Sequence, residues 1–217
     1  MISVPIEFVL GLICALLLNR TFKGRGIVRA LWLMPFMFAP IVIAYQWRWM
    51  FNDQVGIINY ALMRLGLIQH KIAWLADVKT AMISVIISDV WFSTPFLTLL
   101  ILGGLQSLPI EVYEAGEIDG ANVWQKLWYI TLPMMKAIIM AAILIRTMDA
   151  VKTFDLVYIM TNGGPGLRTE MVMTHSYKIA FATFRLGVAS AVAVVGLLIM
   201  MLLSGLILFV FKERKQL

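Results

Sequence analysis

Charged residues are scarce in this chain of 217 residues, of which 14% are charged and 61% are hydrophobic. Because a soluble domain carries roughly 25% charged residues, this composition excludes an ordinary soluble globular protein. Cysteine occurs once, at Cys14, which excludes an internal disulfide and a cysteine-based metal site. The two histidines, His70 and His175, lie in separate parts of the sequence, and we expect neither to bind a metal. Long apolar runs remain, as is typical of membrane proteins.

Motifs of other protein classes are also missing. The chain has no Gly-x-x-x-x-Gly-Lys-[Ser/Thr] loop, the sequence that cradles nucleotide phosphates, and we expect no cofactor on this chain. The chain also lacks a basic run interleaved with aromatic residues, the pattern that would indicate nucleic-acid binding. Its net charge of +6 is better explained by basic loops between membrane spans. No internal repeat or linker divides the sequence, so we expect one transmembrane domain over residues 1–217.

Several apolar segments have lengths near the roughly 20 residues with which a helix crosses a hydrocarbon core of about 30 Å. Backbone groups find no hydrogen-bond partners in lipid, so these segments should be helices. None shows the alternating pattern of barrel strands. The segments are residues 2–18, 30–49, 80–102, 134–160 and 186–211. The sequence therefore predicts an all-α polytopic membrane bundle with about five transmembrane helices, kinked at Pro35, Pro40 and Pro95.

The distribution of lysine and arginine predicts the orientation in the membrane. The loop 19–29 has four basic residues and no acid, and the C-terminal tail KERKQL (212–217) has three basic residues. Because cytoplasmic loops carry such an excess, we expect these two segments and residues 105–133 in the cytoplasm, and Met1 outside. The outer loop 51–79 has apolar residues at helical spacing, which predicts a short interfacial helix with Trp74 near the lipid headgroups.

One segment is too polar to span the membrane and too regular to be a linker. It reads EAGEIDGANVWQKLWYITLP, residues 114–133. Glu111, Glu114 and Glu117 recur every three residues in the early turns of a helix, where acids are favourable. Gly120 interrupts that helix, and the residues 121–129 can form a second one. The pattern thus predicts two short helices outside the membrane, joined at a glycine.

Two interpretations of this segment remain open on physical grounds. The first is an amphipathic loop that lies on lipid headgroups, and the second is a docking surface for a soluble partner. The acidic residues favour docking, because the negative inner leaflet attracts lysine and arginine instead.

The same segment resembles the signature loop of the membrane subunits of ABC importers, which reads Glu-Ala-Ala, three residues, Gly, nine residues, Ile-x-Leu-Pro. At that spacing the chain has Glu114, Ala115, Gly116, Gly120, Ile130, Leu132 and Pro133. Gly116 replaces the second alanine, which we expect to weaken the helix by up to about 1 kcal/mol without preventing docking. Other stretches, such as LLLNRTFKGRGIVRALWLMPF and TFDLVYIMTNGGPG, are similar to carbohydrate-uptake permeases of the maltose and glycerol-phosphate type.

The resemblance implies a function and a set of partners. It implies a multi-pass pore subunit in a bacterial inner membrane, which imports a sugar or sugar-like solute by alternating access. A second permease subunit would complete the pore among membrane lipids, a cytoplasmic ABC ATPase dimer would hydrolyse ATP-Mg, and an extracytoplasmic solute-binding protein would deliver the solute. The chain would be a transporter subunit and not an enzyme. Family members usually have one more N-terminal span, which this sequence does not show.

Polar residues within the expected spans mark a candidate substrate path, because such residues are costly in a membrane. They form one face of the third span and one face of the fourth. The candidates are Asp89, Ser93, Phe96, Arg146, Asp149 and Thr153. Two roles remain open for them: an ion pair of Arg146 with Asp89 or Asp149 that only locks the bundle, or a hydrated cavity that bonds sugar hydroxyls. The resemblance favours the cavity, in which Phe96 would stack on a sugar ring.

Other functional classes also fit this composition. A stand-alone secondary carrier or channel would use Asp89, Arg146 and Asp149, although the sequence lacks the inverted repeats that secondary carriers often have. A non-transporting membrane scaffold is a third class. Co-purification distinguishes them, because only an importer permease should bring down an ATPase subunit.

Overall fold

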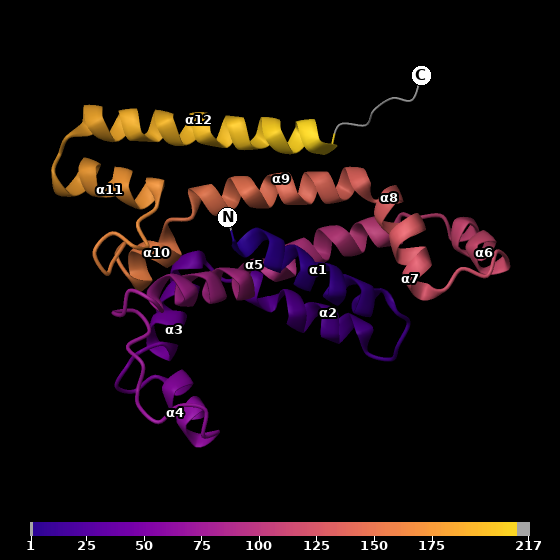
Figure 1. Cartoon of the computed structure of the whole chain (residues 1–217), viewed down its shortest axis with the longest axis horizontal. Helices are drawn as coiled ribbons and strands as arrows, with labels where there is room; N and C mark the ends of the chain where they lie inside the picture. The colour runs from indigo at the N-terminus through magenta and orange to yellow at the C-terminus, as the bar shows by residue number, and fades with distance from the viewer. Residues whose placement is uncertain (1, 212–217) are drawn as a thin grey trace.

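The computed structural model describes residues 2–211 and contains only helices and their connections in that range. This confirms the all-α fold expected from the sequence. Figure 1 shows a bundle of helices that run roughly along one axis, with shorter helices at both ends. Met1 and the basic tail 212–217, for which the sequence predicts opposite sides of the membrane, lie outside the described residues.

The longest helices lie close to where the sequence places spans. Helix α5 (Ala81–Gln106) and helix α12 (Leu186–Phe211) are each long and apolar enough to cross a membrane. Helix α1 (Ser3–Asn19) is apolar but shorter. Pro95 lies inside α5, which nevertheless remains one helix.

The second expected span is bent. Helix α2 (Arg25–Leu33) continues into a 3-10 turn, η1 (Met34–Met37), and helix α3 (Pro40–Met50) then leaves at 91°. The kink expected at Pro35 and Pro40 is therefore confirmed. Proline removes a backbone donor and fixes its own φ angle, so it is tolerated at the first position of α3 and within the short turn before it.

The fourth expected span is divided into three helices, so the prediction of one helix over residues 134–160 was wrong. They are α8 (Leu132–Met134), α9 (Lys136–Lys152) and α10 (Asp155–Met160). The chain leaves the helical conformation at Thr153, and α10 turns away to pack on α3 and α5. That turn buries the apolar side chains of Leu156, Val157 and Met160, which a straight continuation of α9 would carry past α3.

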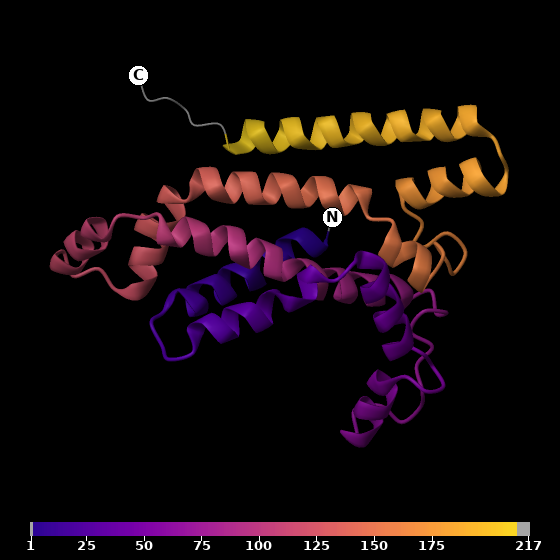
Figure 2. The same ribbon diagram turned by 180° about the vertical axis from the view of Figure 1, so that it is seen from behind.

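The loops at the end of the bundle where α10 lies contain short helices and defined hydrogen bonds. Helix α4 (Ile57–Arg64) confirms the short helix expected in the loop 51–79. The buried Asn59 side chain accepts hydrogen bonds from Ile72 N and from the Trp74 ring nitrogen, and so ties this loop to α4. Helix α11 (Val172–Ala182), which the sequence analysis missed, lies along α12, as both views show (Figures 1 and 2).

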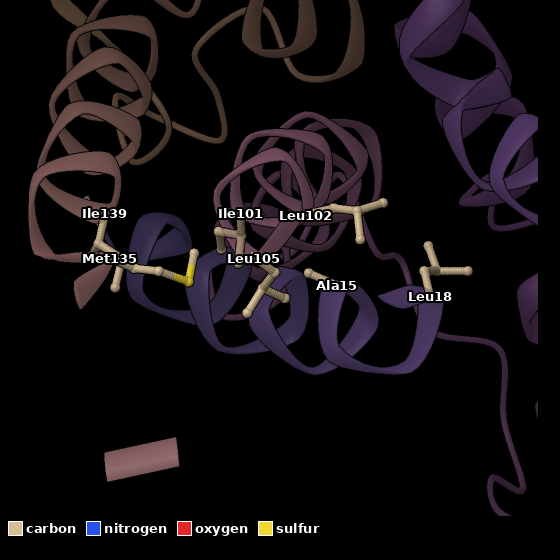
Figure 3. Packing of buried hydrophobic residues seen from close by; sticks show 7 residues of the cluster. All are labelled: Ala15, Leu18, Ile101, Leu102, Leu105, Met135 and Ile139. Atoms are coloured by element: carbon tan, nitrogen blue, oxygen red, sulfur yellow. The ribbon is translucent and has the colours of Figure 1, made fainter. Parts of the chain in front are cut away.

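Close contact between α1 and α5 forms the centre of the bundle. A Cβ atom added at Gly11 would lie 3.1 Å from the Leu97 Cβ and 3.3 Å from the Thr98 backbone nitrogen. Small residues such as Gly11 and Ala15 let two membrane helices approach this closely. Towards the C-terminal ends of α1 and α5, an apolar cluster joins these two helices to the start of α9 (Figure 3). Its buried members are Ala15, Leu18, Ile101, Leu102, Leu105, Met135 and Ile139.

The two ends of the bundle carry different elements. The loop between α1 and α2 lies at the same end as helices α6 (Ile110–Ile118) and α7 (Val123–Gln125), whereas α10 and α11 lie at the opposite end (Figures 1 and 2). Phe211, the last residue of α12, packs against the apolar cluster of Figure 3. Residues 19–29 and 105–133, which the sequence predicts on one side of the membrane, thus share one end of the molecule.

Candidate functional site

A cavity of about 220 Å³ lies among η1, α5, α9 and α10. All six candidate path residues line it, so the structure brings together the two helix faces that the sequence singled out. The sequence analysis did not assign the remaining lining residues to the path: Phe36, Pro40, Phe92, Lys152, Phe154, Asp155 and Leu156. Several of these come from the bends at Pro35–Pro40 and at Thr153, whose directions the sequence does not reveal.

One wall of this cavity is aromatic. Phe36 of η1 stacks on Phe96 of α5 with ring centroids 5.2 Å apart, and it lies 5.7 Å from the ring of Phe92. These distances are typical of attractive aromatic pairs. Ser93 also lines the cavity, and its hydroxyl makes no hydrogen bond within residues 2–211. The wall therefore combines aromatic side chains with a serine.

A buried ion cluster, formed by Glu7, Asp89 and Arg146, joins α1, α5 and α9 beside the cavity. The Arg146 Nε donates to Glu7 Oε2 at 2.5 Å, and its Nη2 donates to Glu7 Oε1 at 2.9 Å and to Asp89 Oδ2 at 2.6 Å. The three residues are 0%, 8% and 3% exposed, in the order named. The interhelical ion pair considered from the sequence is thus present between Arg146 and Asp89, with Glu7 as a further partner.

Glu7 was not among the partners expected for Arg146. The available signal was a carboxylate inside an apolar run, which in a membrane span requires a partner. Asp149, the alternative partner, forms no ion pair with Arg146. It pairs instead with Lys152 at 2.9 Å, where both side chains are about half exposed. Each cation that lines the cavity is therefore already paired with a carboxylate.

The predicted segment outside the membrane forms two helices joined at Gly120, as expected. Gly120 has φ +77°, a conformation that glycine adopts without strain. The Ala121 N–H donates to Gly116 O and the Gly120 N–H donates to Glu117 O, which satisfies the last carbonyls of α6. Asn122 then caps α7 by exchanging hydrogen bonds with Gln125. We call residues 110–131 the elbow.

The elbow is held together by contacts between its two arms. After α7 the chain makes a π-helical turn, η2 (Lys126–Thr131). The Tyr113 hydroxyl hydrogen-bonds the Thr131 hydroxyl at 2.9 Å, and Lys126 pairs with Glu117 at 2.6 Å. A Cβ atom at Gly116 would come within 2.8 Å of the Ile130 Cδ1. Glycine at position 116 thus lets the signature residue Ile130 pack closely on α6.

The other face of the elbow is exposed. Glu111, Glu114, Ala115 and Ile118 lie on one side of α6, and all four are exposed. Two tryptophans of the second arm, Trp124 and Trp128, are 70% and 62% exposed. Two exposed tryptophans on one arm make this surface a candidate interaction site. Leu108 and Leu132, which flank the elbow and form its base, pack against the apolar cluster of Figure 3.

Comparison with known proteins identifies the family of the chain. Residues 7–215 match the family described as the binding-protein-dependent transport system inner membrane component. The chain belongs to this family. It is 37% identical over 218 residues to the trehalose/maltose transport system permease protein MalF of Thermococcus litoralis, with 99% of this chain and 72% of that protein covered. It is 36% identical over 193 residues to the trehalose transport system permease protein SugA of Mycobacterium tuberculosis, with 89% and 60% covered.

Solved structures have the same fold as this family member. A bacterial ABC transporter that imports the acidic polysaccharide alginate matches with a TM-score of 0.87 and 19% sequence identity, covering 99% of this chain and 76% of that one. The alginate transporter in complex with its pentasaccharide-bound periplasmic protein matches with a TM-score of 0.86. At this identity the likeness supports the fold alone.

Membership of the binding-protein-dependent family confirms the resemblance drawn from the elbow motif. The chain is an inner-membrane permease subunit, and its relatives are transporter subunits. Neither a stand-alone carrier nor a scaffold finds support among these relatives. The transport roles of the cavity residues and of the elbow residues stay predictions, since the structure gives their positions and not their ligands.

Proposed function

We propose that this permease forms, with a second permease subunit, the pore of an ATP-driven importer for an uncharged sugar. A cytoplasmic ATPase would grip the elbow, and a solute-binding protein would dock at the α10 end. The observation that carries the proposal is the elbow itself, which presents acidic and aromatic side chains outward while its base is packed into the transmembrane core.

The elbow is built to transmit motion rather than absorb it. Its arms are joined by the Tyr113–Thr131 hydrogen bond and the Glu117–Lys126 ion pair. Its second arm runs through Leu132 and Pro133 to the buried Met135, which lies directly before α9 and belongs to the apolar cluster. Because close-packed interiors shift as units, a force on Glu114 would move the start of α9 and, with it, the cavity wall.

The orientation follows from the basic loop between α1 and α2. This loop lies at the elbow end of the molecule, and loops rich in lysine and arginine remain in the cytoplasm. The elbow and the C-terminus would then face the cytoplasm, where an ATPase subunit is available. The loops around α4 and α11 would face outward, where a binding protein delivers the solute.

The chemistry of the cavity favours an uncharged polyol. Arg146 and Lys152, the cations that line it, are both paired with carboxylates, so an anionic solute would have to displace a carboxylate before it could bind. Carboxylate oxygens, the Ser93 hydroxyl and the aromatic wall are suited to sugar hydroxyls and to the apolar face of a sugar ring. Two relatives named for trehalose transport support the same class.

The proposal is tested by reversing one charge on the exposed face of the elbow. In the complete transporter, Glu114→Lys should abolish ATP-driven uptake in proteoliposomes while the subunit still inserts. Asp53→Lys is the matched control for ATPase binding, because it makes the same charge change in the exposed loop before α4, at the end of the bundle away from the elbow. Co-purification of the ATPase subunit should be weakened by Glu114→Lys and retained by Asp53→Lys.

Two results would contradict this function. The first is a wild-type complex that carries no ATPase subunit and takes up solute without ATP. The second is Glu114→Lys uptake that equals the wild-type rate, since the elbow would then not be the site of ATPase contact.

A further inference from the structure

Arg29 of α2 joins three helices at the elbow end of the bundle. Its Nη2 donates to the backbone oxygen of Leu18 at 2.8 Å, in the last turn of α1. With its amide oxygen turned toward the guanidinium, Gln106 accepts from the same Nη2 at 2.9 Å and from Nη1 at 3.3 Å. Gln106 is the last residue of α5, so one side chain contacts the C-terminal turns of two helices.

These contacts suit the guanidinium group of Arg29. The last carbonyls of a helix have no partner within the helix and carry its negative dipole end. Arg29 has no acidic ion-pair partner within residues 2–211, and its acceptors are the Leu18 carbonyl at the end of α1 and the Gln106 side chain at the end of α5. Nη2 reaches both ends and Nη1 adds a second contact to Gln106, a planar fork of two donors that a lysine ammonium, a single point charge, does not provide.

The position of Gln106 connects this contact to the elbow. Only Ser107, Leu108 and Pro109 separate Gln106 from the first residue of α6. Leu108 packs on the apolar cluster of Figure 3, to which Leu18 also belongs. Arg29 therefore fixes the point at which the chain leaves the bundle to form the elbow.

The same face of α2 continues toward the cavity. Trp32, one turn after Arg29, donates from its ring nitrogen to the Thr98 hydroxyl at 3.1 Å. Phe36, one turn further, stacks on Phe96 in the cavity wall. Polar and aromatic contacts thus hold α2 along α5 from the elbow base to the cavity.

We propose that Arg29 is a positioning residue for coupling, which fixes the elbow base to α2 and thereby to the cavity wall. The inference rests on the proposed function, because it assumes that the elbow receives motion from an ATPase. When the elbow moves, α2 moves with α5 and carries Phe36 along. Without Arg29, the end of α5 shifts relative to α2 when the ATPase moves the elbow. Part of the ATPase-driven movement is then not transmitted to the cavity wall.

The test compares the number of ATP molecules hydrolysed per solute taken up, in proteoliposomes that contain the complete transporter. We expect Arg29→Gln to raise this ratio about fivefold, the lower end of the usual range of coupling between sites, with the KM for solute unchanged. Arg29→Lys, which keeps the charge but not the fork, should give a smaller rise. Lys23→Gln is the matched control, because Lys23 is an exposed cation in the loop just before α2, and it should behave as wild type.

A purely structural role would lower uptake and ATP hydrolysis in proportion, so an unchanged ratio for Arg29→Gln would overturn the inference. If Arg29→Gln fails to assemble, Trp32→Phe tests the same contact line, because it removes only the hydrogen bond to Thr98. A wild-type ratio for Trp32→Phe together with Arg29→Lys would then overturn the inference. A wild-type complex without ATP-driven uptake would instead refute the proposed function.

Discussion

Replacing Arg146 with methionine should destabilise the permease strongly, because it leaves two carboxylates buried without their cation. Arg146 makes hydrogen bonds to Glu7, which is fully buried, and to Asp89, which is 8% exposed. Removing one partner of a buried ion pair costs about 3–5 kcal/mol. Since two acids are left without a partner here, we expect a loss in the upper half of that range.

A compensated variant separates this charge effect from the effect of packing. The triple substitution Arg146→Met, Glu7→Gln and Asp89→Asn removes all three charges while keeping similar volumes. Replacing a whole buried ion cluster by hydrophobic residues is often close to neutral in stability, and a buried amide costs less than an unpaired carboxylate, so the triple variant should recover part of the loss. The free energy of unfolding can be measured by titrating the detergent-solubilised protein with a denaturing detergent.

Two results would refute the reasoning on this cluster. If Arg146→Met were as stable as wild type, the cluster would not be a buried ion cluster in the membrane. If the triple variant were no more stable than Arg146→Met, the loss would come from packing around the arginine stem and not from the unpaired acids.

Two further predictions concern other parts of the bundle. Gly11→Ala should lower the unfolding free energy by about 1 kcal/mol or more, because its new Cβ would lie 3.1 Å from the Leu97 Cβ and against the α5 backbone. Gly103→Ala is the control and should cause no such loss, because its Cβ meets nothing within 4 Å. Equal losses for the two variants in the same detergent titration would contradict this prediction. In the loop before α11, burial raises the pKa of Glu170, but the hydrogen bonds from Lys178 and His175 outweigh it, so this pKa lies below its ordinary value. The stabilisation from Glu170 is therefore present above the unfolded pKa of about 4.3 and is lost as pH falls through the lower folded pKa. Amide hydrogen exchange in α11 should become faster below that pH. The Lys178→Met variant should not show this pH-dependent acceleration.

The elbow was predictable because its determinants are local. Gly120 takes a positive φ angle that other residues rarely adopt, and the acids of α6 occupy its early turns, where the helix dipole favours them. Pro35 and Pro40 likewise indicated the bend after α2. Such signals act within a few residues of themselves, so a single sequence is enough to read them.

The shape of the cavity was not predictable, because it depends on contacts between distant residues. Glu7 and Arg146 are 139 positions apart, and nothing near either residue names the other. The end of α9 at Lys152 gives no strong local signal either, since no proline or glycine follows it directly. The chain turns there because the apolar side chains of α10 gain burial against α3 and α5.

The polar contacts divide the bundle into a part that should move as one body and a part that should not. Helices α1, α5 and α9 share the buried ion cluster, and α2 is joined to α1 and α5 through Arg29 and Trp32. Helix α12 packs on α9 without a hydrogen bond or ion pair between them in residues 2–211, and apolar contacts alone hold membrane helices weakly because lipid is equally apolar. A stroke on the elbow should therefore move α1, α2, α5 and α9 together and slide them past α12.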